Sequence, residues 1–406
     1  MTVERELADL VVRRLDEAYL TTVLVRLLQT PTDVPLGQTE LAPEDPKLAR
    51  YTREVVAPEL ARLGYTRITI DRANNLVCRI GPEGASSPSL LLMGYAVAQH
   101  GNLMADPYSG RIASAAEYGL DEPCAFGQGA TQHKGALAAG LTALKLVAES
   151  GVPLRGPLVF TVNTEGRSSH TCSQLILDGQ GVRTDHGVLL FATGNRISLG
   201  NRGRLDVRIT VRGRSAHSSQ PWLGLSAIDG AYEAQTRLRA LRLTARHPQL
   251  GAAQATLYQV QFAPIAPHTL PDTAVLTVDR RLLPGEAPDA ALAEIRAAIG
   301  DLSPYQVEVA PGALMYPAEV PPDAPIVRAL QAAARATLGR ELETFYLPNT
   351  FDAGYANHVG IPTVMFGPGI RRLGSEVTAE EFVALSHVRD AARVYAYTIL
   401  CLLGAV

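Results

Sequence analysis

The chain has 406 residues, of which 47% are hydrophobic, and this is enough for two domains with a substantial buried core. Its 37 basic and 40 acidic side chains give a formal net charge of -3 and form no long runs, so a nucleic-acid or anionic-membrane partner is not expected. Residues 1–14 lack the apolar core and cleavage site of a secretory signal, and the four cysteines form no C-x-x-C pair. We therefore expect a cytoplasmic protein with free thiols and no disulfide framework.

The first predicted elements are two helices and two short strands. Apolar residues recur at helical spacing over residues 6–28, where a Thr-Pro-Thr sequence then ends the pattern. A second helix is expected to end at Gly64, because glycine suits the left-handed position after a helix. Strands are expected at residues 66–70 and 75–80.

Four short apolar runs have the length and composition of strands that are buried on both faces of a sheet. They cover residues 89–97, 158–165, 187–192 and 363–366. A helical stretch, residues 134–149, joins the first two runs and favours a parallel crossover. Together these segments predict an α/β layer.

The pattern changes over residues 198–310. Apolar and polar residues alternate over residues 205–211, which is typical of a strand with one solvent-facing side. Helices are expected at residues 226–241 and 289–299, with a strand at residues 274–281 between them. This predicts a separate α+β insert. No apolar run approaches the ~18 residues that a transmembrane helix needs.

Five segments, in chain order, resemble the dinuclear zinc family of amidohydrolases and peptidases that includes acetylornithine deacetylase, succinyl-diaminopimelate desuccinylase and carboxypeptidase G. Residues 89–97 resemble the family strand that ends in G-H-x-D, and residues 126–135 resemble its G-R-G-x-x-D-x-K-G motif. Residues 162–166 resemble the strand end D-E-E. The segments that resemble the family's lid and its C-terminal part are residues 211–219, 270–281, 351–354, 360–363, 366–369 and 380–383.

The resemblance implies an α/β fold with a three-layer α/β/α catalytic domain of the zinc-exopeptidase type, formed by residues 1–197 plus 311–406. It also implies an inserted α+β (ferredoxin-like) lid at residues 198–310, which serves as a dimerisation domain. The expected partners are a second copy of the chain, bound through the lid, and a small-molecule or peptide ligand with a carboxylate.

The positions that hold zinc in the resembled family carry other residues here. In that family two zinc ions share a bridging carboxylate, and each also binds a His and a further carboxylate. Tyr95 stands where the first His is expected, and Val97 where the Asp that orients this His is expected. Gln132 stands at the position of the bridging Asp, and Gly166 and Ala192 at two further acidic positions. None of these is a usual zinc ligand, so we expect no metal and no other cofactor.

Other functional positions of the family are retained. Glu165 stands at the position of the catalytic base, and His217 at that of the lid His that polarises the substrate carbonyl. Without zinc, a water at Glu165 would lack the Lewis acid that supplies hydroxide near neutral pH. His268 stands where the family usually has Asn. The residues for which the resemblance implies ligand contacts are Arg281, His268, Tyr95, Gln132, Gly367 and Gly369.

Simpler interpretations of these residues remain open. Glu165 could be a carboxylate that is merely paired with Arg167, and His217 could donate a hydrogen bond within the lid or the dimer interface. A relocated metal site could also be formed by residues near the former ligand segments, namely His100, His133, His170 and Glu376.

We therefore predict a degenerate member of an amide-bond hydrolase and peptidase family. It binds an N-acyl amino acid or a peptide-like ligand without ordinary two-zinc hydrolysis. The alternative is an active amidohydrolase or peptidase, either metal-free with Glu165 as base or with an unrecognised metal site. The ligand's identity does not follow from the sequence, because ligand pockets are built by loops.

Overall fold

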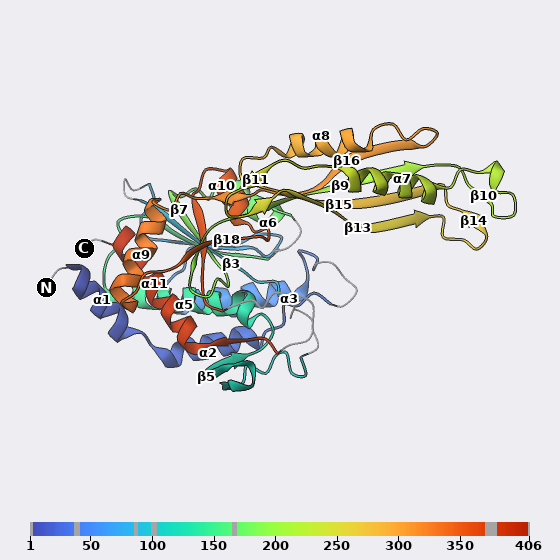
Figure 1. The fold of residues 1–406 in the computed structure, drawn as a ribbon. Helices are drawn as coiled ribbons and strands as arrows, with labels where there is room; N and C mark the ends of the chain where they lie inside the picture. The colour runs from blue at the N-terminus through green and yellow to red at the C-terminus, as the bar shows by residue number, and fades with distance from the viewer. Residues whose placement is uncertain are drawn as a thin grey trace. The chain divides into compact units, whose positions relative to one another are not determined.

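The computed structural model describes residues 3–35, 41–84, 88–98, 104–164, 169–369 and 380–404. The chain forms two compact units (Figure 1). The first, here called the sheet unit, comprises residues 1–200, 319–345 and 355–406. The second, here called the lid unit, comprises residues 201–318 and 346–354.

The sheet unit is built on a mixed sheet with the strand order β1-β2-β6-β3-β7-β19-β8-β17, and β18 also pairs with β8. The bounds are Ile68–Ile70 (β1), Leu76–Ile80 (β2), Leu90–Tyr95 (β3), Leu158–Asn163 (β6), His186–Leu190 (β7), Ile197–Asn201 (β8), Ala318–Glu319 (β17), Thr344–Leu347 (β18) and Thr363–Phe366 (β19). β3 lies parallel to β6 and β7, and β7 lies parallel to β19. The four apolar runs of the sequence are therefore four neighbouring parallel strands, and the predicted α/β class is confirmed.

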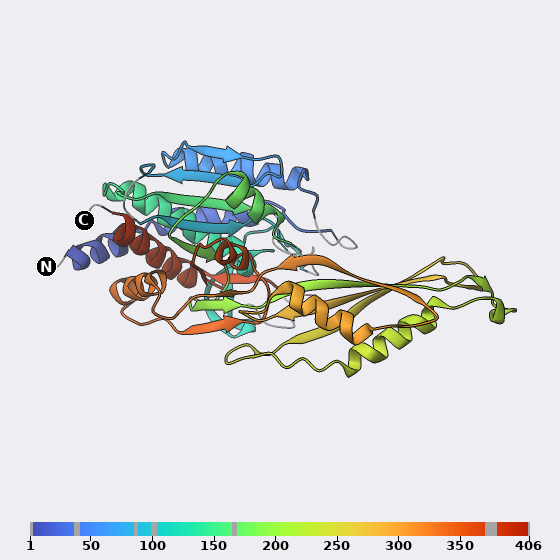
Figure 2. The ribbon, with the colours of Figure 1, turned by 90° about the horizontal axis from the view of Figure 1, so that it is seen from above.

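Helices pack against this sheet and against one another. α5 contacts β3 and β7, α9 contacts β7 and β19, and α11 contacts both α5 and α9. α1 lies against α9 and α11, as Figure 2 shows. The bounds are Val3–Arg14 (α1), Glu17–Leu28 (α2), Pro46–Ala49 (α3), Arg50–Val56 (η1), Ala57–Arg62 (α4), Ala130–Lys134 (η3), Gly135–Ser150 (α5), Thr171–Gln174 (α6), Leu175–Gly179 (η4), Pro325–Leu338 (α9), Ala353–His358 (α10) and Leu385–Leu403 (α11). A side chain at Gly140 would place its Cβ 2.8 Å from the Leu190 side chain, so glycine permits the close approach of α5 to β7.

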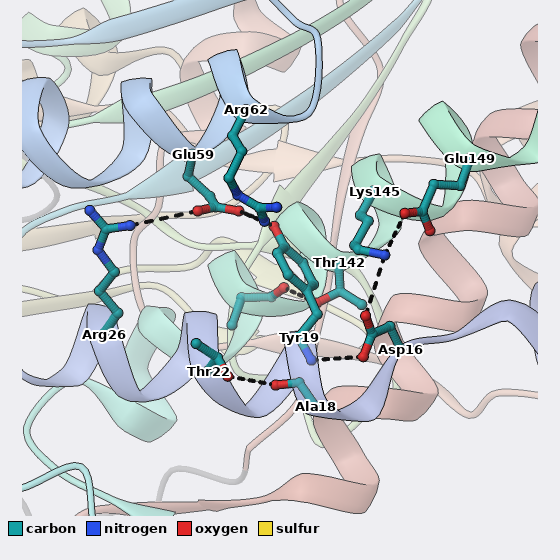
Figure 3. Close-up of polar contacts among 11 residues, drawn as sticks. Asp16, Ala18, Tyr19, Thr22, Arg26, Glu59, Arg62, Thr142, Lys145 and Glu149 are labelled. Carbon is teal, nitrogen blue, oxygen red and sulfur yellow. Dashed lines mark hydrogen bonds and ion pairs between the residues drawn. The ribbon is translucent and has the colours of Figure 1, made fainter.

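The N-terminal helix is interrupted, which corrects the prediction of one helix over residues 6–28. Asp16 ends the first segment and caps the second, because its carboxylate accepts a hydrogen bond from the backbone N–H of Tyr19 at 2.9 Å. Polar contacts then join α2 to α4 and α5 (Figure 3). The Tyr19 hydroxyl donates to Glu59 at 2.7 Å, and Arg62 donates to the same carboxylate at 2.6 Å. Lys145 pairs with Asp16 at 3.4 Å.

A small antiparallel sheet in the sheet unit has the order β20-β5-β4. Its strands are Ile112–Ala115 (β4), Leu120–Phe126 (β5) and Phe382–Ala384 (β20), and a short turn of helix, Ala116–Tyr118 (η2), follows β4. The rings of Tyr118, Phe126 and Phe382 pack together with centroids 5.1–6.4 Å apart. This packing brings the chain before β20 next to the loop after β5.

The lid unit is an α+β structure. Its antiparallel sheet has the order β13-β15-β9-β16, and α7 and α8 pack against it. The apolar residues that alternate along β9, Leu205, Val207, Ile209 and Val211, are all buried in the core that these helices cover. The bounds are Gly203–Arg212 (β9), Ala216–His217 (β10), Pro221–Leu223 (η5), Ala227–Ala240 (α7), Arg246–His247 (β11), Gly251–Ala252 (β12), Gln254–Ala263 (β13), Thr269–Leu270 (β14), Thr273–Leu282 (β15), Pro288–Ile299 (α8) and Gln306–Met315 (β16). The predicted α+β insert is thus observed. Within the described residues, no helix is long and apolar enough to cross a membrane.

Candidate functional site at the carboxyl edge of the sheet

The carboxyl ends of β6, β3, β7 and β19 lie side by side, and ligands of α/β proteins bind at this edge. Tyr95, the last residue of β3, lies opposite Asn163, the last residue of β6. The backbone N–H of Phe191, just after β7, donates to the carbonyl oxygen of Phe366 in β19 at 3.2 Å. We call these strand ends and the segments that follow them the carboxyl edge.

Tyr95 is a buried residue of this edge, with 3% of its surface exposed. Its ring meets the ring of Phe191 edge to face, with centroids 6.2 Å apart. Val97 and Ala192, the next two positions at which the resemblance implies acidic groups, are also buried and carry apolar side chains. These three positions therefore offer one neutral phenol and no carboxylate.

Gln132 lies in η3, which contacts the end of β3. Its side-chain N–H donates to the carboxylate of Glu381 at 3.3 Å. The same carboxylate accepts backbone N–H groups from Gly129 at 2.8 Å and from Thr131 and Gln132 at 3.0 Å each. Successive N–H groups of this kind form a cradle for an anion at the start of a helical segment. Here Glu381 fills the cradle from within the chain.

The next charged group is Lys134, which is fully buried. Its ammonium donates to the carbonyl oxygen of Thr30 at 2.8 Å. Burial lowers the pKa of Lys134 to about 7, and the charges of Glu381 and Asp33 oppose that shift. Burial raises the pKa of Glu381, while its three backbone N–H donors and Lys134 oppose the rise. Lys134 is thus buried and Glu381 partly buried, and both lie near Gln132.

His133 and His170 occupy different surroundings. The Nε2 atom of His133 lies 3.0 Å from the carbonyl oxygen of Ala96, which fixes the ring beside the end of β3. His170 precedes α6, and its ring stacks near Tyr355 with centroids 5.3 Å apart. In the described segments, no three His, Cys, Asp or Glu side chains are grouped so as to hold a metal ion. Glu165, Gly166, His100 and Glu376 lie outside the described residues.

Gly367 and Gly369 also lie at the carboxyl edge. A Cβ at Gly367 would lie 2.6 Å from the carbonyl oxygen of Phe191, so the fold itself requires glycine there. Gly369 has a φ of 86°, and a Cβ on it would lie 3.1 Å from the carbonyl oxygen of Thr131. The structure thus brings Tyr95, Gln132 and both glycines together. It also shows that close backbone packing requires glycine at these two positions, independently of any ligand.

The predicted lid residues fall into two places. His217 and His268 lie at one end of the lid sheet, with ring centroids 6.2 Å apart. The Nδ1 atom of His217 accepts the backbone N–H of Ser219 at 3.2 Å, which leaves the proton of a neutral ring on Nε2. Arg281 lies near the other end of β15 and pairs with Asp279 at 2.8 Å. Eight residues of strand separate Thr273 from Arg281, or roughly 26 Å, so one small ligand cannot contact both places of a single lid unit.

Two site residues, Glu381 and Lys134, were not predicted. The signal for Glu381 was weak, because two consecutive glutamates before a short apolar run are usually solvent-facing. Lys134 lies within the G-x-x-D-x-K-G resemblance, but a lysine in a sequence carries no sign of complete burial. The pairing of β20 with β5 places Glu381 beside the glycine-containing loop, which Lys134 adjoins in the sequence.

The family model that matches this chain describes a class of peptidases. The model of peptidase family M20/M25/M40 matches residues 100–400, and the chain belongs to this family. The predicted resemblance is therefore confirmed at the level of the family.

Relatives and solved structures agree with this membership. The uncharacterized protein YgeY of Escherichia coli is 27% identical over 340 residues, which are 77% of this chain and 80% of that protein. A succinyl-diaminopimelate desuccinylase of Methylobacterium nodulans is 29% identical over 312 residues, 72% of this chain and 75% of that protein. The M20 family metallo-carboxypeptidase Sso-CP2 of Sulfolobus solfataricus has the same fold, with a TM-score of 0.73 at 14% identity over 95% of this chain and 98% of that one.

Proposed function

We propose that this chain binds an N-acyl amino acid or a peptide-like ligand and does not perform the two-zinc amide hydrolysis of its family. The observation that carries the proposal is the hydrogen bond of the Gln132 side chain. Where the resemblance implies a bridging carboxylate, Gln132 offers a neutral amide whose N–H is already directed to Glu381. Zinc is held in proteins by thiolate, imidazole and carboxylate groups. A carboxamide that is hydrogen-bonded to the Glu381 carboxylate is therefore a poor zinc ligand.

The neighbouring donors support the same conclusion. Tyr95 packs its ring against Phe191. Asn163, the last residue of β6, and the following Thr164 carry amide and hydroxyl groups. Thr164 donates its hydroxyl to the carbonyl oxygen of Ala73 at 2.7 Å, and Asn163 donates to Ser173 at 3.0 Å. A dinuclear zinc centre therefore does not fit the described side chains of the carboxyl edge.

The metal content of the purified protein tests this proposal. The chain is purified without chelator, incubated with excess zinc or cobalt, desalted and analysed for metal by elemental analysis. We expect negligible metal before and after the incubation. Two tightly bound metal ions per chain would overturn the proposal and restore an ordinary hydrolase.

The second candidate function is an active amidohydrolase or peptidase. It uses Glu165 as base without metal, or a metal held by residues such as His100, His133, His170 and Glu376. Turnover of N-acetyl amino acids and dipeptides, measured with and without added metal, separates these cases from simple binding. Metal-free turnover that Glu165→Gln abolishes would establish the metal-free enzyme. Metal-dependent turnover would point to the unrecognised metal site.

The ligand class is inferred from the lid and from the relatives. Arg281 is 27% exposed in its side chain and could meet a ligand carboxylate. A relative at 29% identity is named a succinyl-diaminopimelate desuccinylase, and its name says that it removes a succinyl group, which is an acyl group. We propose a ligand of this general class, with a free carboxylate, and propose ligand contacts for His217, His268 and Arg281.

We also propose that two copies associate through the lid unit. β13 is an edge strand, and its Val260 and Phe262 are 41% and 38% exposed. On α7, which contacts β13, Ile228 and Tyr232 are 45% and 70% exposed. A long apolar edge strand invites pairing with another strand. The separation of His217 from Arg281 within one lid supports a ligand site that draws these residues from two copies.

A further inference from the structure

Two aspartates face each other across neighbouring strands of the lid sheet. Asp206 of β9 lies directly opposite Asp279 of β15 in the antiparallel register. Both side chains are largely buried, with 17% and 19% of their surfaces exposed. The Cβ atoms of directly opposite residues lie about 5 Å apart, and like charges in such positions repel one another. The register therefore brings two carboxyl groups together in a place that water reaches poorly.

The oxygens of the two carboxyl groups differ in their contacts. The Oδ2 atom of Asp279 accepts two hydrogen bonds from Arg281, at 2.8 and 3.1 Å. The Nε atom of Arg204 lies 3.4 Å from the Oδ1 atom of Asp206, without the geometry of a hydrogen bond. Among the described residues, the Oδ1 atoms of both aspartates are buried and have no hydrogen-bond partner. A buried oxygen without a donor is costly, and a proton on one carboxyl would supply that donor.

The strands on either side both bulge next to this pair. On β13, Thr256 lies opposite Asp279, and Tyr258, which is 58% exposed, stands at the bulge. On β16, a bulge places Gly312 beside Asp206, where a Cβ would lie 3.2 Å from the Cβ of Asp206. The helices of the lid unit cover the opposite face of the sheet. In the described structure, the flanking strands therefore face the pair with a hydroxyl, a phenol and a glycine, and with no further carboxylate.

The cations that face the pair are Arg204 and Arg281, which lie opposite each other two residues away on the same strands. Burial raises the pKa of Asp206, and the charge of Asp279 adds to this rise, while the charges of the two arginines oppose it. The resulting shift is upward. The arginines thus do not fully offset burial and the second carboxylate.

We propose that Asp206 and Asp279 share one proton between their Oδ1 atoms and form a pH-sensitive carboxyl pair in the lid unit. The proton turns a repulsive contact into a hydrogen bond from a carboxylic acid to a carboxylate, and its loss as the pH rises restores the repulsion. Proton uptake also reduces the negative charge that holds Arg281. That effect on Arg281 rests on the proposed function, in which Arg281 contacts a ligand, whereas the shared proton does not.

Burial of Asp206 alone is the competing explanation. In that case the proton belongs to Asp206 and stays there when Asp279 is neutralised. A shared proton belongs to the pair, so neutralising either carboxyl abolishes its uptake. The sign follows from linkage: a carboxyl whose folded pKa is raised above its usual 3.8 takes up its proton in the folded state first. The wild type therefore gains stability from the pair as the pH falls through the folded pKa.

The experiment is denaturant unfolding of the full chain between pH 8 and pH 4.5, for the wild type, Asp206→Asn and Asp279→Asn. Each variant carries a neutral amide of the same size, which can donate to the remaining carboxylate. We expect the midpoint of each variant, relative to the wild type, to be highest at pH 8 and to decline as the pH falls. Glu308→Gln is the matched control, because Glu308 is exposed and lies opposite the neutral Thr210 in the same sheet. Its difference from the wild type should not depend on pH.

An Asp279→Asn variant that keeps the pH dependence of the wild type would overturn the shared proton and leave burial of Asp206 as the cause. Differences that are independent of pH for both variants would overturn it as well. If the variants do not fold, carbon-13 NMR of the wild-type aspartate carboxyls provides the test. Two carboxyl signals should titrate together above the usual aspartate range, and a spectrum without them would contradict the proposal. Since no ligand is present in these measurements, a failure of the proposed ligand binding leaves their outcome unchanged.

Discussion

Glu381 is the residue around which the described side chains of the carboxyl edge are arranged. It accepts three backbone N–H groups and the side-chain N–H of Gln132, and the charge of the buried Lys134 ammonium opposes the rise of its pKa. Gln132 is compatible with this carboxylate because its amide is neutral and can donate. A carboxylate at position 132 would instead face a second carboxylate, and a bound cation would be needed to hold the two together.

Gln132→Glu tests this arrangement without changing the size of the side chain. At pH 8 we expect a loss of stability of about 1–3 kcal/mol, because a hydrogen bond to a buried carboxylate becomes a repulsive contact. The loss should shrink as the pH falls, since one carboxyl of the pair can then take up a proton and donate. Denaturant unfolding at pH 8 and pH 5.5 measures both effects. The exposed Gln249→Glu serves as control, and an equal loss at the two pH values would contradict the explanation.

At the scale of elements, the contacts of Glu59 join α2 to α4. Glu59 is 7% exposed and accepts hydrogen bonds from Tyr19 and Arg62. Burial alone would raise the pKa of Glu59, but these two hydrogen bonds and the charges of Arg62 and Arg26 outweigh burial, and the pKa is lowered from its usual 4.5. A carboxyl with a lowered pKa in the folded state stabilises the fold above its unfolded pKa, and this contribution is lost as the pH falls through the folded value.

Glu59→Gln should therefore destabilise the chain by about 1–3 kcal/mol at pH 7. The difference between the wild type and the variant should narrow as the pH falls below 4.5, where the wild-type carboxyl begins to take up its proton. Urea unfolding across pH 3.5 to 7 provides the measurement. Tyr19→Phe removes only one of the hydrogen bonds and should cost less. A difference that is constant across this pH range would show that the charge of Glu59 contributes nothing.

The sequence predicted elements well where one physical signal dominated. The uninterrupted apolar runs of β3, β6, β7 and β19 follow from burial on both faces, and the alternation along β9 follows from burial on one face. The break at Asp16 was missed because the helical spacing of apolar residues continues across it. β20 was also missed, since a strand of three residues is defined by its partner β5 and not by its own composition.

At the scale of the whole molecule, the sequence was sufficient to predict the family and the two-part architecture. It was not sufficient to predict the hydrogen bonds and charges around the candidate site. Tyr95 and Gln132 could be located by resemblance. What surrounds them could not, because Glu381 reaches Gln132 through the pairing of β20 with β5, and the burial of Lys134 depends on the elements that pack around it.

Association of two copies is the prediction that belongs to the whole molecule. The patch formed by Val260 and Phe262 on β13 and by Ile228 and Tyr232 on α7 is apolar and exposed. Light scattering after size exclusion should give twice the chain mass of 43.4 kDa. Phe262→Asp should weaken association about 100-fold, because it forfeits the ~2 kcal/mol of burying the exposed part of the ring and brings a charge into the contact. Ile112→Asp, which changes an exposed apolar residue of the sheet unit, should leave the mass unchanged. A wild-type mass of one chain would contradict the proposed dimer, and with it a ligand site that combines His217 of one copy with Arg281 of the other.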